Sequence, residues 1–127
     1  MTDAAPVVVA AAVIEREGRF LVTRRLEGTH LAGCWEFPGG KCEPGERVTE
    51  CLARELREEL DVSARVGVEI LRTTYTYPER TVELHFFRCD LAGNPTPMMG
   101  QQIQWVRRED LRALEFPPAD RELVDLL

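Results

Sequence analysis

The stretch "FPGGKCEPGERVTECLARELREELDV", Phe37 to Val62, decides most of what this sequence predicts. Three glycines and two prolines precede a run of helix-forming residues, so we expect irregular backbone over residues 39–45. A helix should then start near Glu46 or Arg47 and end near Leu60. Because glycine lets backbone approach a ligand closely, the stretch predicts a ligand-binding loop that leads directly into a highly charged helix.

An apolar stripe and a carboxylate face lie side by side on this predicted helix. At about 100° per residue, Leu52 and Leu56 fall on the core-facing stripe. Glu55, Glu58 and Glu59 fall on adjoining positions, and Glu59 projects close to the stripe. A carboxylate near a buried stripe is costly without a partner. Two interpretations remain open: a solvated, salt-bridged helix face, or oxygen ligands for Mg²⁺ or Mn²⁺ that bind a phosphate ester or anhydride.

The rest of the chain alternates between strand and helix patterns. The apolar run over residues 7–14 lacks alternation, so this strand should be covered on both faces. Further elements follow from β-branched residues, turn signals and short amphipathic segments. The order predicts one α/β domain over residues 1–127, with a mixed sheet and helices on both faces. The expected strands cover residues 7–14, 19–25, 35–37, 65–77, 81–90 and 103–106, and the expected short helices cover 108–114 and 120–127.

Charge and composition exclude several classes of partner. The net charge of −6 argues against binding to a nucleic-acid polymer or an anionic membrane. A small phosphorylated ligand remains compatible with this charge if metal ions bridge it to the protein. The first apolar run has only eight residues and is too short to span a membrane. We therefore expect a cytoplasmic protein.

The four cysteines, Cys34, Cys42, Cys51 and Cys89, form no C-x-x-C pair. With only two histidines in the chain, a structural zinc site is not expected. A cytoplasmic protein keeps its cysteines reduced. We therefore predict that all four are free thiols.

The spacing in the opening stretch resembles the Nudix box. That motif is Gly, five residues, Glu, seven residues, then Arg-Glu-aliphatic-x-Glu-Glu-x-Gly-aliphatic. Here Gly40 and Glu46 are followed by the run from Arg54 to Val62, and every fixed position matches except Asp61, where the family has glycine. Asp tolerates the left-handed conformation common after a helix, so we expect little effect on the chemistry.

The resemblance is closest to the MutT-like branch, which includes 8-oxo-dGTP diphosphatases and CTP pyrophosphohydrolases. "WEFPGGK" and "FPPAD" support it outside the box. It implies an α/β/α sandwich and metal-dependent hydrolysis of a nucleoside triphosphate to the monophosphate and pyrophosphate. This activity would sanitise the nucleotide pool, acting on 8-oxo-dGTP or a cytosine nucleotide. The alternatives are a non-catalytic nucleotide sensor, or a hydrolase of another nucleoside diphosphate derivative.

The resemblance also implies roles for individual residues. Mg²⁺ or Mn²⁺ would be held by three helix glutamates and one loop carbonyl, and an Arg–Glu pair would brace the loop against the helix. One helix carboxylate would also accept a proton from the attacking water. The implied metal ligands are Glu55, Glu58, Glu59 and the carbonyl of Gly39, and the bracing pair is Arg54 with Glu46. The candidate substrate contacts are Arg25, Phe37, Gly40, Lys41, Tyr77, Arg80 and Asp120.

Three of these candidates keep alternative interpretations. Arg25 and Lys41 are either phosphate contacts or solvated surface charges. Asp120 follows Pro-Pro-Ala, where some family members contact the base and the 8-oxo-dGTP-selective enzymes have asparagine. An ionised Asp only accepts hydrogen bonds, which favours a donor-rich edge such as the cytosine amine. Alternatively, Asp120 caps the C-terminal helix.

One further position departs from the family pattern. Many members place another carboxylate before the strand that here contains Trp105, whereas this chain has Met99 there and no acid nearby. A thioether is a poor ligand for a hard cation. We therefore expect activity with fewer metal ions, or with weaker recruitment of the last one.

Overall fold

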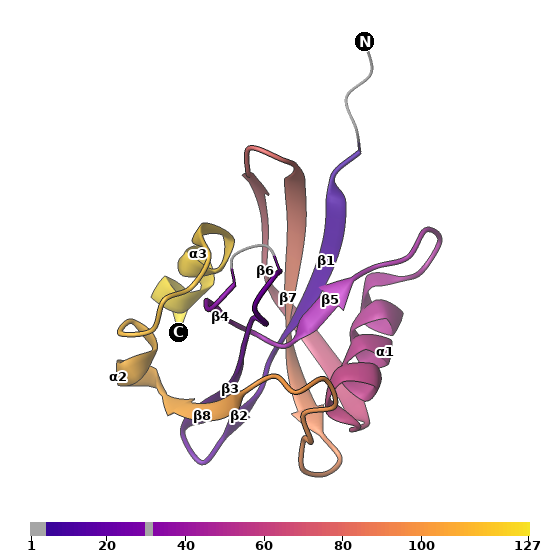
Figure 1. Cartoon of the computed structure of the whole chain (residues 1–127). Helices are drawn as coiled ribbons and strands as arrows, with labels where there is room; N and C mark the ends of the chain where they lie inside the picture. Colours follow the sequence, from indigo (N-terminus) through magenta and orange to yellow (C-terminus); the bar gives the residue numbers. More distant parts are fainter. Residues whose placement is uncertain (1–4, 30–31) are drawn as a thin grey trace.

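A four-stranded mixed sheet separates helix α1 from helices α2 and α3 (Figure 1). The computed structural model describes residues 5–29 and 32–127. Its strands are β1 (Val7–Val13), β2 (Glu15–Arg16), β3 (Arg19–Arg24), β4 (Trp35–Glu36), β5 (Gly39–Lys41), β6 (Ala64–Thr76), β7 (Thr81–Leu91) and β8 (Ile103–Arg107). Its helices are α1 (Val48–Leu60), α2 (Arg108–Leu111) and α3 (Pro118–Leu126). The predicted α/β class, mixed sheet and helices on both faces are confirmed.

The central sheet has the order β5-β1-β7-β6. Strands β1 and β7 run parallel, and the two edge strands pair antiparallel to them. Ala10 and Ala12 of β1 pack toward α1, whereas Ala11 and Val13 pack toward the opposite core. The sheet is therefore covered on both faces at β1, as the unbroken apolar run predicts.

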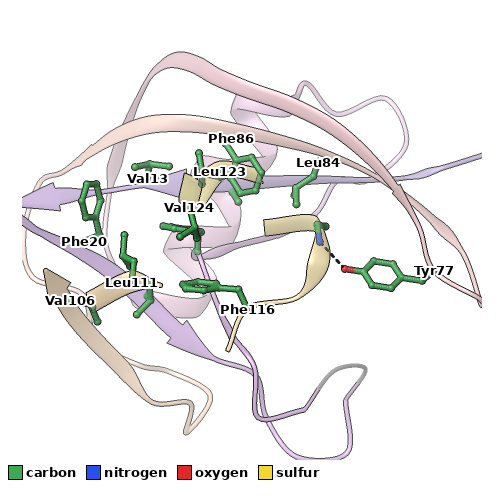
Figure 2. Packing of buried hydrophobic residues seen from close by; sticks show 14 residues of the cluster. Val13, Phe20, Tyr77, Leu84, Phe86, Val106, Leu111, Phe116, Leu123 and Val124 are labelled. Atoms are coloured by element: carbon green, nitrogen blue, oxygen red, sulfur yellow. Dashed lines mark hydrogen bonds between the residues drawn. The ribbon is translucent and has the colours of Figure 1, made fainter. Parts of the chain in front are cut away.

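The core on the α3 face is built around aromatic side chains (Figure 2). The ring of Phe37 stacks on Phe116 at 5.4 Å between centroids and meets Phe86 edge-on at 6.1 Å. The Ala119 N–H at the start of α3 donates to the Tyr77 hydroxyl at 3.4 Å. These contacts fix α3 beside the strands, so the residues in its first turn have a defined position.

Helix α1 follows the predicted pattern closely. Leu52, Leu56 and Leu60 are fully buried. The helix ends at Asp61, which has φ 49° and ψ 48° and donates its N–H to the Arg57 carbonyl at 3.1 Å. Asp61 thus takes the left-handed conformation expected where the family has glycine. No helix in residues 5–29 and 32–127 is long and apolar enough to cross a membrane.

The glycine segment forms a strand, so the prediction of irregular backbone from residue 39 was wrong. Gly39 and Gly40 of β5 pair with Ala11 and Ala10 of β1. A β-carbon on Gly39 would overlap with the carbonyl oxygen of Ala10. Glycine is thus used here for close strand packing, which the local sequence does not distinguish from a loop.

The prediction of four free thiols was also wrong. Cys42 and Cys51 form a disulfide, with 5.2 Å between their Cα atoms, whereas Cys34 and Cys89 are free. Cys42 directly follows β5, and Cys51 lies in the first turns of α1 on its buried side. The disulfide therefore connects the glycine strand to the helix that carries the carboxylates.

Candidate active site

A cleft of about 560 Å³ opens at one end of the central sheet. Its walls come from β1, β3, β4, β5, β7, α1 and the start of α3. The cleft brings together all seven candidate substrate contacts and three of the four candidate metal ligands. The predicted residues that line it are Arg25, Phe37, Gly39, Gly40, Lys41, Glu55, Glu59, Tyr77, Arg80 and Asp120.

Gly40 lies against the carboxylate of Glu55 on the floor of the cleft. A β-carbon on Gly40 would overlap with the Oε2 and Cδ atoms of Glu55. Strand β5 and helix α1 therefore pack so closely that only a hydrogen fits between backbone and carboxylate. This close approach explains why glycine precedes the helix of glutamates.

Arg54 connects the segment after β5 to α1. Its guanidinium donates to Glu46 twice, from Nε to Oε2 at 2.7 Å and from Nη2 to Oε1 at 3.0 Å. The same side chain donates to the Lys41 carbonyl at 3.2 Å and to Glu55 Oε1 at 2.9 Å. The expected Arg54–Glu46 pair is thus present. Its hydrogen bonds lower the pKa of Glu46 to about 2.

Glu55 and Glu59 are the two carboxylates of α1 that reach the cleft. Burial raises the pKa of Glu59 to about 8, with a further contribution from the negative charge of Glu55. Burial also raises the pKa of Glu55, against the opposing effect of Arg54. No described residue donates a hydrogen bond to the Glu59 carboxylate. Two crowded, desolvated carboxylates fit a divalent cation, because a bound cation would neutralise both.

Glu58 occupies a different position. Its side chain is 58% exposed, lies outside the cleft lining and pairs with Arg54 at 3.2 Å. Within residues 5–29 and 32–127, no three His, Cys, Asp or Glu side chains are arranged to hold a metal. The carboxylate of Glu58 would have to rotate toward the cleft to join Glu55 and Glu59. Its role as a ligand, like that of the Gly39 carbonyl, stays a prediction.

Asp120 lies in the same cleft, away from α1. Asp120 is only 6% exposed, and its carboxyl group has no hydrogen-bond partner among the described residues. Burial and the nearby Glu36 raise its pKa well above the usual range. Pro117 is the N-cap of α3, and no side chain caps that end. The alternative that Asp120 caps the helix is therefore wrong.

Sequence reasoning missed Glu36 and Gln101, which also line the cleft. Glu36 accepts a hydrogen bond from Arg25 at 2.8 Å, and burial nonetheless raises its pKa. The sequence did contain an indication of Glu36, because this charged residue stands between two aromatic residues, Trp35 and Phe37. No sequence pattern marked Gln101, because it stands among other polar residues in the connection between β7 and β8. Met99 lines the cleft and is 53% exposed. The expectation that methionine at this position lowers the number of bound metal ions, or weakens recruitment of the last one, stays a prediction.

Comparison with protein families agrees with the geometry of the cleft. The model of the NUDIX domain matches residues 9–126. The chain belongs to the Nudix family. Members of this family generally need a divalent metal, in keeping with the carboxylate oxygens of Glu55 and Glu59 in the cleft.

Two curated Nudix relatives cover almost the whole chain. An 8-oxo-dGTP diphosphatase of Haemophilus influenzae is 37% identical over 121 residues, which cover 94% of this chain and 89% of that protein. A CTP pyrophosphohydrolase of Escherichia coli is 38% identical, over 92% of this chain and 87% of that protein. The predicted MutT-like branch of the Nudix hydrolases is confirmed.

Solved structures show the same Nudix fold. The solution structure of the E. coli ORF135 protein has a TM-score of 0.83 and 36% identity, and the match covers 94% of this chain and 86% of that one. The crystal structure of a MutT protein from Methanosarcina mazei has a TM-score of 0.87 and 27% identity, over 98% and 95% of the two chains. The predicted α/β/α architecture is thus found in experimentally determined relatives.

Proposed function

We propose that this Nudix hydrolase converts a nucleoside triphosphate to the monophosphate and pyrophosphate, with Mg²⁺ or Mn²⁺ bound at Glu55 and Glu59. One observation carries the proposal. Two desolvated carboxylates, Glu55 and Glu59, line the same cleft as Gly39 and Gly40, and Glu55 lies directly against Gly40.

We assign one group of cleft residues to metal binding and others to orienting that group and leaving room for the substrate. Glu55, Glu59 and, after rotation, Glu58 would hold the cation, which would supply charge neutralisation and an activated water when bound. Arg54 keeps Glu55 oriented through its 2.9 Å hydrogen bond. Gly40 leaves room for the carboxylate and the ligand. Phosphoryl substitution then depends mainly on positioning and electrostatics.

The cationic side chains of the cleft suit the polyphosphate. Arg25, Lys41 and Arg80 come from three separate parts of the chain and line the same cleft. Lys41 forms no ion pair with the described residues, so its ammonium group is available to a phosphate. Together these residues support binding of a small polyanion to a chain whose net charge is −6.

The base is proposed to lie near Phe37 and Asp120. Related proteins are named for two different substrates, 8-oxo-dGTP and CTP. We favour a cytosine nucleotide, because its exocyclic amine can donate to a carboxyl oxygen of Asp120 in either protonation state. A protonated Asp120 offers both a donor and an acceptor, which suits the adjacent carbonyl and N–H groups of 8-oxoguanine. The proposed substrate is a free nucleotide of the cytoplasmic pool rather than a nucleic-acid polymer.

The test is product analysis with a nucleotide panel. The protein is incubated with Mg²⁺ and CTP, dCTP, 5-substituted dCTP, dGTP or 8-oxo-dGTP, and the nucleoside monophosphate and pyrophosphate are quantified. The expected result is hydrolysis that a chelator abolishes, with the highest kcat/KM for a cytosine nucleotide. A preference for 8-oxo-dGTP would contradict the choice of base.

Matched variants connect the activity to the cleft. Glu59→Gln should lose most turnover, because it removes a charged metal ligand. Glu50→Gln is the control on the same helix, since glutamine can still accept the hydrogen bond that Glu50 takes from the Arg47 N–H at 3.2 Å. If the wild type binds nucleotides but releases no pyrophosphate from any of them, the sensor interpretation holds instead. Hydrolysis confined to other nucleoside diphosphate derivatives would support the remaining alternative.

A further inference from the structure

The connection between β7 and β8 is fastened to the C-terminal end of α1. The Thr96 N–H donates to the Leu60 carbonyl at 2.7 Å, and the Met98 N–H donates to the Glu59 carbonyl at 3.0 Å. Both carbonyls are among the last four of the helix, which have no partner within the helix itself. A segment distant in sequence therefore completes the end of α1 that carries Glu59.

Gln101 adds two hydrogen bonds at the same point. Its Nε2 donates to the Glu59 carbonyl at 3.1 Å, and its Oε1 accepts from the Met99 N–H at 2.8 Å. One amide group thus links Met99, on the wall of the cleft, to the backbone of Glu59, on the floor. Gln101 also lines the cleft itself.

The Glu59 carbonyl accepts two hydrogen bonds from this connection, whereas the Glu59 carboxylate has no hydrogen-bond partner among the described residues. The direction of that carboxylate therefore depends on how firmly its backbone is fixed. Residues that orient a metal ligand without touching the metal commonly affect metal affinity. Gln101 lies where it can do this for Glu59.

We propose that Gln101 is a positioning residue, which fixes the Glu59 carboxylate and the Met99 wall in the cleft. The polar link is what matters, because two hydrogen bonds of the Gln101 amide join it to Met99 and Glu59. This inference rests on the proposed metal-dependent function for its Mn²⁺ and activity readouts. Its first test uses metal-free protein and does not depend on that function.

The first experiment is amide hydrogen exchange on wild type and Gln101→Met. Methionine keeps the length of the side chain and removes both hydrogen bonds. The Met99 amide should exchange roughly fivefold to tenfold faster, the scale of one lost hydrogen bond. Gln104→Met is the control, because Gln104 is exposed on β8 and makes no side-chain hydrogen bond to a described residue. Wild-type exchange in Gln101→Met would overturn the proposal.

The second experiment titrates Mn²⁺ into the same proteins and counts the bound ion by electron paramagnetic resonance. Gln101→Met should bind Mn²⁺ about tenfold more weakly, with an unchanged KM for the nucleotide at saturating metal. Its kcat at limiting Mg²⁺ should fall and recover as Mg²⁺ is raised. Faster exchange with unchanged Mn²⁺ affinity would reduce Gln101 to a structural link and overturn the positioning role. If the wild type hydrolyses no nucleotide, the exchange and Mn²⁺ results still decide the question.

Discussion

Gly40 lies so close to the Glu55 carboxylate that a β-carbon on residue 40 would occupy the place of the carboxylate group. The glycine strand and the helix of glutamates are thus one unit rather than a flexible loop beside a helix. The hydrogen bond from Arg54 to the Lys41 carbonyl joins the same strand and helix, and the Cys42–Cys51 disulfide and the Arg54–Glu46 pair tie the segment after the strand to the helix.

Gly40→Ala should displace Glu55 and weaken metal binding between about 10-fold and 100-fold, the range seen when the support of a ligand is lost. The added methyl group overlaps with the Glu55 carboxylate rather than with a side chain of the hydrophobic core, so the protein should still fold. Mn²⁺ titration measures the effect. Gly93→Ala is the control, because a β-carbon there meets no atom within 4 Å. Equal Mn²⁺ affinity of Gly40→Ala and wild type would show that Glu55 is not a main ligand.

Arg54→Ala should lower both the melting temperature and kcat, the latter roughly tenfold to a hundredfold. The change leaves Glu46 without its two-point partner and removes the hydrogen bond that orients Glu55. Arg54→Lys should restore little of the melting temperature or of kcat, because lysine cannot make the planar double contact with Glu46. Thermal melts and steady-state kinetics decide this. Wild-type melting and turnover in Arg54→Ala would exclude the bracing role.

Reduction should destabilise the protein by roughly 2–3 kcal/mol, because the disulfide closes a short loop of nine-residue separation. Denaturant titration with and without dithiothreitol measures the difference. The double variant Cys42→Ser, Cys51→Ser should show no response to the reductant. Thiol titration of denatured, unreduced protein should find two thiols, those of Cys34 and Cys89. Four thiols would mean that the bond does not form in solution.

Asp120→Asn should raise stability at neutral pH. The pKa of Asp120 is raised in the folded protein, so the folded state keeps a proton that the unfolded chain loses near pH 4. Folding stability of the wild type therefore falls as pH rises from about 4 toward the folded pKa. Asn does not ionise, so the melting temperature of the variant should exceed that of wild type more at pH 8 than at pH 5.

Two outcomes would contradict this account of Asp120. One is a lower melting temperature of Asp120→Asn at pH 8. The other is an unchanged substrate ratio, because the variant should shift kcat/KM toward 8-oxo-dGTP over dCTP by about tenfold or more. Asp125→Asn, on the exposed side of the same helix, is the control.

Local patterns predicted most of the fold because they were strong and continuous. The spacing of Leu52, Leu56 and Leu60 identified α1, and the unbroken apolar run identified β1 as covered on both faces. Strand β5 was missed because its pairing depends on β1, about 30 residues earlier in the chain. The Cys42–Cys51 disulfide depends on that same pairing.

The sequence predicted the site residues that belong to one continuous motif. It did not indicate the contacts that distant segments of the chain add to the site. Glu55 and Glu59 followed from the box, and the cleft contains both. The hydrogen bond from Gln101 to the Glu59 carbonyl joins residues 42 positions apart, so no local pattern could indicate it. The burial of Asp120 depends on α3 packing against Tyr77 and was likewise beyond the sequence.

The most direct measurement of the central claim is proton release when Mn²⁺ binds, by calorimetry in buffers of different ionisation enthalpy. Glu59 has a pKa of about 8, so in metal-free protein it is mostly protonated at pH 7 and mostly ionised at pH 9. Mn²⁺ binding should release close to one proton at pH 7 and little at pH 9, with affinity rising across this range. Glu59→Gln should bind more weakly and release almost none, whereas Glu50→Gln should match wild type. No proton release at pH 7, or equally tight Mn²⁺ binding by Glu59→Gln, would contradict the assignment of this carboxylate to the metal site.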